Sequence, residues 1–224
     1  MDERVQRLER MFSDYVGLAD RIHADPKSAN EFYDDLRTRL SRWHLAVENV
    51  AWLACLDMGD TQSRWGHDVI SGRQIKACLG AKRWMIEGKH LHVDTKGVED
   101  LPISGNPDLT RAIWENLLDN AIKYTDEGGH VWISVDKSGD YAQIMFRDDG
   151  RGIPCEALPH IFERYTQFGD SSQPGGLGLG LAVVKEAALA LNGDVFCSSK
   201  PGKGTTVQVR LPIARKQEGQ CSEQ

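Results

Sequence analysis

The feature that most constrains the fold is a run of glycines placed directly before a helix. The stretch GGLGLGLAVV, Gly175 to Val184, has four glycines within six residues and continues into an apolar, helix-like run. Glycine lets the backbone approach another group closely, and the N–H groups at the start of a helix attract anions. The stretch lacks the GK[ST] ending of a Walker A loop and the G-x-G-x-x-G spacing of a dinucleotide fingerprint. It therefore predicts a phosphate-binding loop of another kind.

Composition excludes several classes of protein. Of the 224 residues, 40% are hydrophobic and 27% charged, as is ordinary for a soluble globular protein. The net charge of −6 argues against broad binding to nucleic acid. No signal peptide is evident, and the apolar run NVAWLACL (Asn49 to Leu56) is too short to span a membrane. The five cysteines are scattered and lack CxxC spacing, which predicts reduced thiols and a cytoplasmic location.

Two heptad patterns predict a helical hairpin over residues 1–60. Apolar residues recur at steps of three and four from Val5 to Ile22 and again from Leu36 to Ala54. The stretch HADPKS (His23 to Ser28) separates them, because proline cannot continue the interior of a helix. A single hairpin cannot bury both apolar seams. We therefore expect two copies to form a four-helix bundle, which makes the chain a homodimer.

A second domain is expected over residues 68–213, between a linker at 61–67 and a disordered tail at 214–224. The fold class is thus α+β, a helical hairpin followed by an α/β sandwich. Hydrophobic periodicity predicts the elements of the second domain. They are a helix within 68–86, a strand at 90–95, a helix at 106–125, strands at 130–136 and 141–148 joined by KSGD, a helix at 179–192 ended by Gly193, and strands at 194–200 and 205–212 joined by PGKG.

The helix expected at 106–125 carries a polar stripe suited to a metal and a phosphate. Asn116, Asn120 and Lys123 recur at i, i+4 and i+7 and so share a face, while the opposite face is apolar. Amide oxygens can ligate a hard cation such as magnesium, and a lysine can reach a phosphate. Taken alone, the stripe is equally compatible with a solvated helix face and capping asparagines.

A carboxylate at the end of a predicted strand is the next candidate. In RDDGRGIP, Arg147 to Pro154, the strand runs into D-x-G-x-G, where glycines permit a sharp turn. Asp148, if buried at the floor of a cleft, would accept a hydrogen bond from an exocyclic amine. An acidic turn that binds nothing is the alternative. A further glycine turn, PGKGTT at 201–206, enters the last strand.

Taken in order, these segments resemble the ATP-binding domain of sensor histidine kinases. ENLLDNAIKYT looks like the N box of that family, DDGRGIP its G1 box, IFERYTQF its F box, GGLGLGL its G2 box and GKGTT its last glycine motif. The resemblance covers residues 68–212. It implies the Bergerat ATP-binding fold, a mixed sheet of about five strands with helices on one face and ATP on the other.

The resemblance also implies roles for the matching residues. Asn120 would ligate magnesium, Asn116 would line the phosphate side and Lys123 would meet a phosphate. Tyr124 would border the nucleotide, and Asp148 would read the adenine amine. The other residues implied to bind ATP are Gly150, Gly152, Ile153, Gly176, Leu177, Gly178, Leu179, Gly180 and Thr205.

The glycines divide between two tasks under this resemblance. Gly150 and Gly152 would make room for the base. Gly176, Gly178 and Gly180 would form the hinge and cradle of a lid that spans residues 162–176. The polar, glycine-rich character of that segment suits a lid that becomes ordered only when nucleotide binds.

The N box also bears on the type of reaction. Related ATPases of the gyrase and chaperone type resemble one another in a glutamate that activates water, four residues before the magnesium asparagine. Asn116 occupies that position here, and Glu115 is displaced by about 100° around the helix. We therefore expect little ATP hydrolysis and favour phosphoryl transfer to an external acceptor, with positioning and magnesium supplying most of the catalysis.

The phosphate acceptor of the family is not evident. A histidine is expected on the first helix of the hairpin, and that position falls near Gln6. DDLRTRL places Asp34 where the histidine would stand, but too little chain would remain for a second helix, so we regard this match as accidental. His23, His44 and His67 are better explained as surface or packing residues.

Three functions remain open. The leading one is the dimeric core of a two-component kinase, which binds ATP and Mg²⁺, signals to a response regulator receiver domain and phosphorylates a histidine that this chain lacks. The second is a non-enzymatic protein that binds ATP and docks a response regulator or another kinase. The third is a serine kinase that restrains a sigma factor, against which the long hairpin and the F box count.

Overall fold

The structure is a computed structural model, and the residues it describes are 29–59, 67–98, 100–167 and 177–214. The chain divides into two compact units, Met1–His44 and Leu45–Gln224. Helix α2 (Ala29–Asp57) confirms the second predicted heptad helix, and its residues from Leu45 onward belong to the second unit. The first heptad helix, the HADPKS turn and the tail beyond residue 214 lie outside the described residues.

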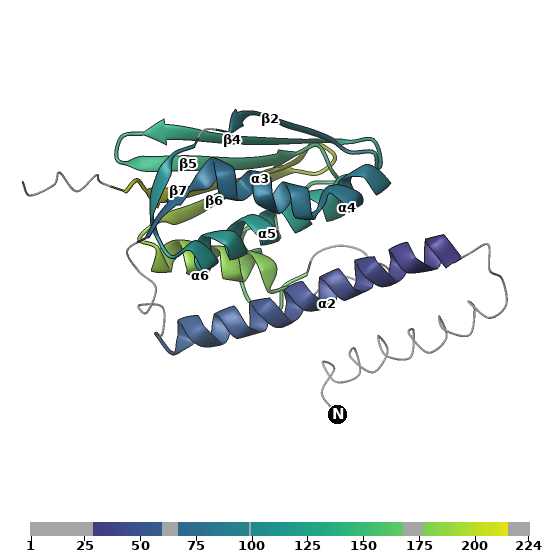
Figure 1. Ribbon diagram of the computed structural model, residues 1–224, viewed down its shortest axis with the longest axis horizontal. Helices are drawn as coiled ribbons and strands as arrows, with labels where there is room; N and C mark the ends of the chain where they lie inside the picture. Colours follow the sequence, from purple (N-terminus) through teal and green to yellow (C-terminus); the bar gives the residue numbers. More distant parts are fainter. Residues whose placement is uncertain (1–28, 60–66, 99, 168–176, 215–224) are drawn as a thin grey trace, which may run out of the picture. The chain divides into compact units, whose positions relative to one another are not determined.

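A five-stranded mixed sheet of order β2-β4-β5-β7-β6 forms the centre of the second unit (Figure 1). Strand β2 pairs in parallel with β4, and the other neighbours are antiparallel. The predicted mixed sheet and both predicted hairpins are therefore confirmed. The strands are β2 (His92–Val98), β4 (His130–Ser138), β5 (Tyr141–Asp148), β6 (Asp194–Lys200) and β7 (Gly204–Pro212).

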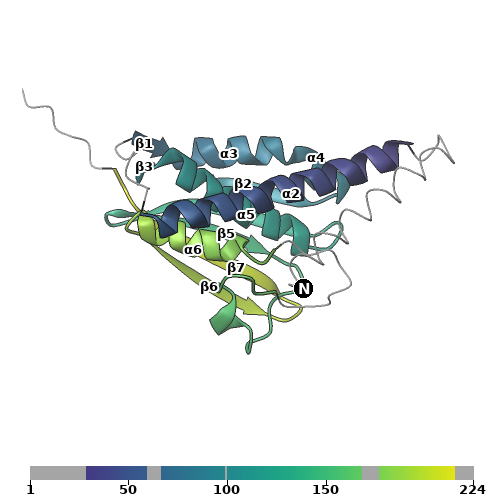
Figure 2. The same cartoon turned by 90° about the horizontal axis from the view of Figure 1, so that it is seen from below.

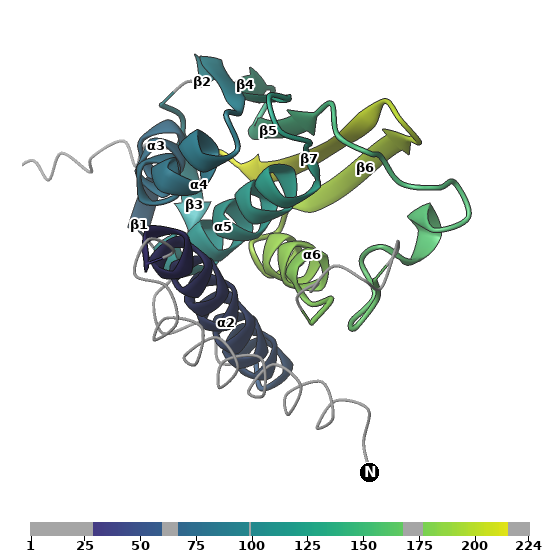
Figure 3. The same cartoon turned by 90° about the vertical axis from the view of Figure 1, so that its right-hand side faces the viewer.

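Helices cover one face of this sheet, and no described helix covers the other (Figure 3). On β5, Ala142, Ile144 and Phe146 alternate with more exposed residues and enter the core. Trp114 of the central helix stacks on Phe146 with ring centroids 6.1 Å apart. The core thus lies between the sheet and its helices. These are α3 (Ser71–Ala81), α4 (Arg83–Gly88), α5 (Pro107–Tyr124) and α6 (Gly180–Ala190).

Helix α5 begins where the sequence predicts. The Asn106 side chain accepts hydrogen bonds from the backbone N–H groups of Asp108 and Leu109, at 2.8 and 3.3 Å. Pro107 occupies the first helical position, where a missing N–H has no cost. This cap sets the start of the helix, and so the rotation of the residues along it.

Helix α6 ends differently from the prediction. Asn192, and not Gly193, adopts the left-handed conformation, with φ of 57°. The N–H groups of Asn192 and Gly193 bond to the carbonyls of Leu189 and Ala188, at 3.0 and 2.8 Å, as in a Schellman motif. Gly193 is required for another reason, because a Cβ there would collide with the carbonyl of Arg210.

A small second sheet was not expected from the sequence. Strands β1 (His67–Ile70) and β3 (Pro102–Gly105) pair antiparallel. Each is four residues long, too short for periodicity to identify. His67, placed in the linker by the sequence, opens β1. Ala214, placed in the tail, is buried and donates its N–H to the carbonyl of Pro102 at 2.9 Å.

The C-terminal half of α2 packs beside α5 and α6, although the sequence assigned it to the hairpin (Figure 2). Leu53 is 5% exposed and joins Ala112, Leu179 and Val183 in one apolar cluster. The expected seam lies on another side of the helix, where Val47 is 62% exposed. Among the described helices, none has the length and apolar character needed to cross a membrane.

Candidate functional site

Asp148 ends β5 on the face that the helices cover. It is 9% exposed and alternates in phase with Phe146. One oxygen, Oδ1, accepts hydrogen bonds from the N–H groups of Gly150 and Thr205, at 3.0 and 3.2 Å. Its other oxygen has no hydrogen-bond partner among the described residues. Burial raises the pKa of this carboxyl above its usual range, and nearby Asp149 adds to the effect, while the two N–H groups oppose it. The carboxylate is therefore poised to accept a hydrogen bond from a ligand.

A hydroxyl beneath this carboxylate joins the turn after β5 to the last hairpin. Ser199 Oγ accepts from the Ile153 N–H at 2.8 Å and donates to the carbonyl of Gly204 at 2.8 Å. Its proton is thereby used, so the 2.9 Å contact with Thr205 Oγ1 has threonine as the donor. Ile153 and Thr205, both predicted site residues, are held together by a serine that the sequence analysis did not identify.

The glycines of the turn are required by the protein itself. A Cβ on Gly150 would collide with the carbonyl of Tyr124, and one on Gly152, with φ of 70°, would collide with the carbonyl of Lys200. The Arg151 N–H also donates to the Tyr124 carbonyl at 3.3 Å. These glycines therefore let three backbone segments meet around Asp148, a role distinct from leaving space for a base.

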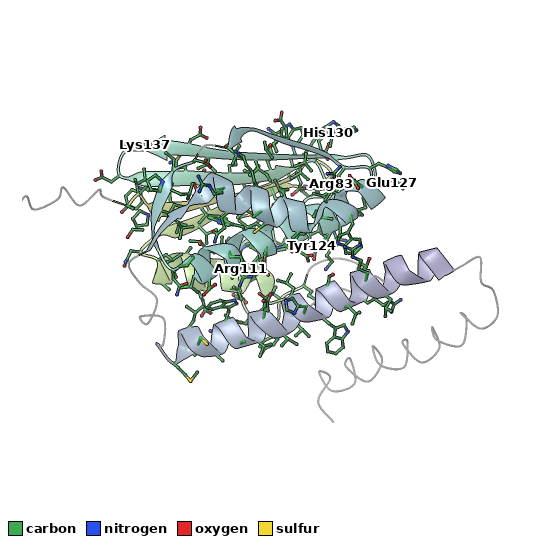
Figure 4. All side chains as sticks on the ribbon, in the orientation of Figure 1. Arg83, Arg111, Tyr124, Glu127, His130 and Lys137 are labelled. Carbon is green, nitrogen blue, oxygen red and sulfur yellow. The ribbon has the colours of Figure 1, made fainter. Side chains whose placement is uncertain are left out.

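Tyr124 lies at the C-terminal end of α5 (Figure 4). The Tyr124 ring contacts two cations: Lys123 Nζ lies 4.7 Å from its centroid and the Arg151 guanidinium 4.5 Å. Cations at this distance are attracted to the face of an aromatic ring. Arg151 was not predicted, because it occupies the variable position of D-x-G-x-G and meets Tyr124 only through the fold.

A half-buried amine holds the last turn of α5. Lys89 Nζ donates to the carbonyls of Ile122, Lys123 and Thr125, at 2.9, 3.1 and 2.7 Å. Carbonyls at the end of a helix lack partners within it and attract positive charge. Lys89 therefore fixes the turn that carries Lys123 and Tyr124.

The predicted polar stripe of α5 divides into two parts. Asn116 is 2% exposed, and its amide exchanges two hydrogen bonds of 2.8 Å with the amide of Asn49 on α2. A Cβ on Gly180 would lie 2.7 Å from Asn116 Oδ1, so the start of α6 packs on the same amide. Only Asn120 and Lys123 are half-exposed. The expectation that all three residues look into one open site is therefore wrong for this conformation.

Asn120 is the candidate metal ligand. Its side chain has no hydrogen-bond partner in the part of the chain that the structure describes. The same part contains no group of three His, Cys, Asp or Glu side chains able to hold a metal. A magnesium ion at Asn120 would need most of its ligands from phosphate and water, as this ion commonly does. The residues suit an ion that arrives with a nucleotide.

The two ends of the predicted lid lie together. The Tyr165 N–H donates to the carbonyl of Gly178 at 2.9 Å. Gly178 has φ of 70°, and a Cβ there would lie 2.6 Å from the carbonyl of Thr166. Leu177 and Leu179 pack in the apolar cluster around Leu53. Gly176 and residues 168–175 lie outside the described residues.

The candidate site lies on the helix-covered side of the sheet. Asp148 points to the same side as Phe146, which contacts α5, and Asn120, Lys123 and Tyr124 are part of α5 itself. The expectation that ATP lies on the opposite, uncovered face is therefore wrong for these residues.

The remaining expectations concern the general base for water and the residue that accepts the phosphoryl group. Glu115 lies 4.0 Å from Arg111, and the step of five residues from it to Asn120 turns the helix by about 140°, so the two are on different sides of α5. His44 is exposed on α2. His67, in β1, pairs with Gly105 of β3. Gln6 and His23 lie outside the described residues. Asp34 belongs to α2, but its side chain is not described.

Comparison with known proteins places this geometry in a family. Residues 105–215 match the histidine kinase-, DNA gyrase B-, and HSP90-like ATPase family. Sensor histidine kinase WalK of Bacillus subtilis is 36% identical over 128 residues, which are 55% of this chain and 21% of WalK. The chain thus spans about a fifth of the length of that curated relative.

Solved structures show the same fold. A histidine kinase of Acinetobacter baumannii, AdeS, aligns with a TM-score of 0.68 and 19% identity over 93% of this chain and 98% of that chain. Full-length ShkA, solved in complex with AMPPNP, aligns with a TM-score of 0.64 and 21% identity over 84% of this chain and 39% of that chain. Together with the N box, the G1 turn and the G2 helix start, these matches show that the chain contains a domain of the histidine kinase-, DNA gyrase B- and HSP90-like ATPase family.

Proposed function

We propose that this chain is the ATP-binding core of a two-component sensor histidine kinase. It binds Mg–ATP and transfers the γ-phosphoryl group to a histidine that a partner supplies or that lies beyond this chain. The observation that carries the proposal is Asp148, a buried carboxylate with one oxygen held by two N–H groups and the other unengaged among the described residues. The AMPPNP bound by the structural neighbour ShkA supports a nucleotide as the ligand.

Each part of the site has a task in this proposal. Asp148 accepts a hydrogen bond from the adenine amine, with Gly150, Ile153 and Thr205 shaping the floor around it. Lys123 and Arg151, held against Tyr124, supply positive charge for phosphate oxygens. When bound with ATP at Asn120, magnesium would neutralise phosphate charge in the transition state.

The side chains near Asn120 favour transfer over hydrolysis. The position of the water-activating glutamate holds Asn116, whose amide cannot take a proton from water. Glu115 lies about 100° around the helix from that position and 4.0 Å from Arg111, so it does not replace that glutamate. Because neither of these two positions supplies a general base for water, the γ-phosphoryl group remains available to an acceptor that docks from outside.

The proposal includes a homodimer and a response regulator. Within the second unit, Val47, Val50 and Ala54 form an exposed apolar stripe on α2 with helical spacing, and the exposed Met58 follows directly after the helix. A second copy of the chain would cover this stripe in a four-helix bundle. A response regulator receiver domain in the cytoplasm would then take the phosphoryl group from the acceptor histidine.

Phosphoryl transfer provides the test. The protein is incubated with γ-labelled Mg–ATP, alone and with a histidine-bearing hairpin domain or a receiver domain, beside the Asp148→Asn variant. Acid-labile label on histidine, lost in the variant, is the expected result. ATP binding without transfer would instead favour the non-enzymatic docking protein, and acid-stable label on serine would favour the sigma-factor type of kinase. Absence of any heat of ATP binding by calorimetry would overturn the proposal.

A further inference from the structure

A pair of hydroxyl groups connects the last two strands beside Asp148. Ser199 of β6 pairs with Thr205 of β7 in the antiparallel register, and their hydroxyl oxygens are 2.9 Å apart. Thr205 alternates in phase with the core residues Val207 and Val209, so its side chain lies on the helix-covered side of the sheet. Asp148 lies on the same side and accepts a hydrogen bond from the Thr205 N–H. The Thr205 hydroxyl is therefore part of the candidate site.

The direction of each hydrogen bond in this pair follows from the number of protons. A serine hydroxyl has one proton to donate and two lone pairs with which to accept. Two groups lie 2.8 Å from Ser199 Oγ: the Ile153 N–H, which can only donate, and the Gly204 carbonyl, which can only accept. The Ser199 proton points to that carbonyl, because two facing oxygens without a proton between them would repel. The second lone pair of Ser199 then accepts the proton of Thr205.

The Thr205 hydroxyl is thereby left with lone pairs alone. Among the described residues, Ser199 is the one hydrogen-bond partner of Thr205 Oγ1, and it takes the only proton. The unengaged oxygen of ionised Asp148 is also purely an acceptor. A bound molecule therefore meets two acceptors and no hydroxyl donor here. An exocyclic amine has two protons and can satisfy both acceptors, whereas a carbonyl in its place would leave both unpaired.

We propose that Ser199 is a positioning residue that makes the site select a purine with an amino group at position 6 over one with a carbonyl there. It acts through Thr205, whose proton it takes, so that Thr205 accepts one proton of the amine and Asp148 accepts the other. This inference rests on the proposed binding of ATP. A site built to pair with a donor rejects an analogue without that donor, because the acceptors of the protein then remain unpaired.

The variant Thr205→Val tests whether this hydroxyl accepts a proton of the amine. Calorimetry compares Mg²⁺-bound ATP with purine riboside triphosphate, which lacks the amine. We expect the variant to bind ATP about threefold to tenfold more weakly, the effect of one hydrogen bond, and the amine-free nucleotide as the parent does. Thr206→Val, one residue further along β7 and on its other face, is the matched control and should change neither affinity. An equal effect of Thr205→Val on both nucleotides, or no effect, overturns the inference.

The variant Ser199→Ala tests whether the serine sets this direction. Without Ser199 the Thr205 proton is free to meet inosine triphosphate, which has a carbonyl where ATP has the amine. We expect the ratio of ATP affinity to inosine triphosphate affinity to fall about threefold to tenfold, whereas a purely structural loss would weaken both nucleotides alike. Ser198→Ala, on the other face of β6, should match the parent. An unchanged ratio in Ser199→Ala overturns the inference.

A double variant shows whether Ser199 acts through Thr205. In protein that already carries Thr205→Val, Ser199→Ala should leave the affinity ratio unchanged, because no hydroxyl remains to reorient. A ratio that still falls overturns the inference. If Ser199→Ala does not fold, Thr205→Val still decides, because its result depends on the direction that Ser199 sets.

These measurements separate the inference from the proposed function. If the parent binds none of the three nucleotides, the proposed function fails and the inference fails with it. If the parent binds ATP and inosine triphosphate equally well, only the inference fails.

Discussion

At the scale of single residues, Asp148 serves binding at a cost to the fold. Its carboxyl is buried, and burial raises its pKa. The folded protein therefore holds the proton of this group more tightly than the unfolded chain does. Protonated Asp148 stabilises the fold at low pH, and this contribution is lost as the pH rises through the raised pKa. At neutral pH the buried charge destabilises the fold, and a ligand amine would add a hydrogen bond to the two that Gly150 and Thr205 already donate.

The variant Asp148→Asn separates the effect of the carboxylate on stability from its effect on ATP binding. The amide oxygen of asparagine can still accept from Gly150 and Thr205, but the buried charge is gone. We expect the variant without nucleotide to melt above the parent at neutral pH, with the difference shrinking toward acidic pH. ATP binding should weaken by more than about 1 kcal/mol, because a charged acceptor is lost. Thermal melts across pH and calorimetry measure both. Unchanged ATP affinity would contradict the adenine role.

Gly152 tests whether backbone approach explains the G1 turn. Both Gly152 and Gly139 have positive φ, at 70° and 60°, but only Gly152 has a carbonyl, that of Lys200, where a Cβ would lie. We expect Gly152→Ala to lower the free energy of unfolding by about 3 kcal/mol, and Gly139→Ala by about 1 kcal/mol. Urea denaturation measures both. Equal losses would mean that φ alone matters.

At the scale of elements, α5 connects the fold to the site. Its start is set by the Asn106 cap and its end by Lys89, so its rotation and its length are both determined. The two residues differ in their distance along the chain from α5. Asn106 is adjacent in sequence to the helix that it caps, whereas Lys89 reaches α5 from the turn after α4. Local patterns can therefore predict the first cap but not the second.

Replacing Lys89 should loosen the end of α5. Lys89→Gln loses a cation at three helix carbonyls and should reduce the free energy of unfolding by about 1 to 3 kcal/mol. Lys76→Gln, at an exposed position of α3, is the control and should change little. Denaturant titration gives the two values, and equal stability of the variants would show that the Lys89 contacts contribute nothing.

At the scale of the whole molecule, α2 presents two faces with different roles. One face packs on α5 and α6 through Leu53, while Val47 and Val50 remain 62% and 49% exposed. Exposed aliphatic residues at helical spacing are typical of an interface. The heptad pattern predicts one apolar face of the helix. It does not predict the second, buried face, because that face contains a polar residue, Asn49.

The oligomeric state tests the exposed face. We expect the parent to sediment as a dimer. Val47→Glu places a charge in the proposed interface and should shift the protein to monomer, because a charge cannot be buried there without a partner. Ser138→Glu adds the same charge at an exposed position of β4, outside α2, and should leave the dimer intact. A monomeric parent, or a Val47→Glu variant that remains dimeric, would remove the basis for the bundle.

The sequence by itself determined the helices and strands whose periodicity is long, the order of the sheet-forming hairpins, and the ordered motifs that identify the ATPase family. Each of these depends on neighbours in the chain, through side-chain alternation, caps and glycine turns. Only the tertiary structure decided that Asn116 pairs with Asn49, that Ser199, Lys89 and Arg151 support the candidate site, and that Asp148 lies on the helix-covered side of the sheet. These features join residues far apart in sequence, and their partners are chosen by packing, which no local pattern records.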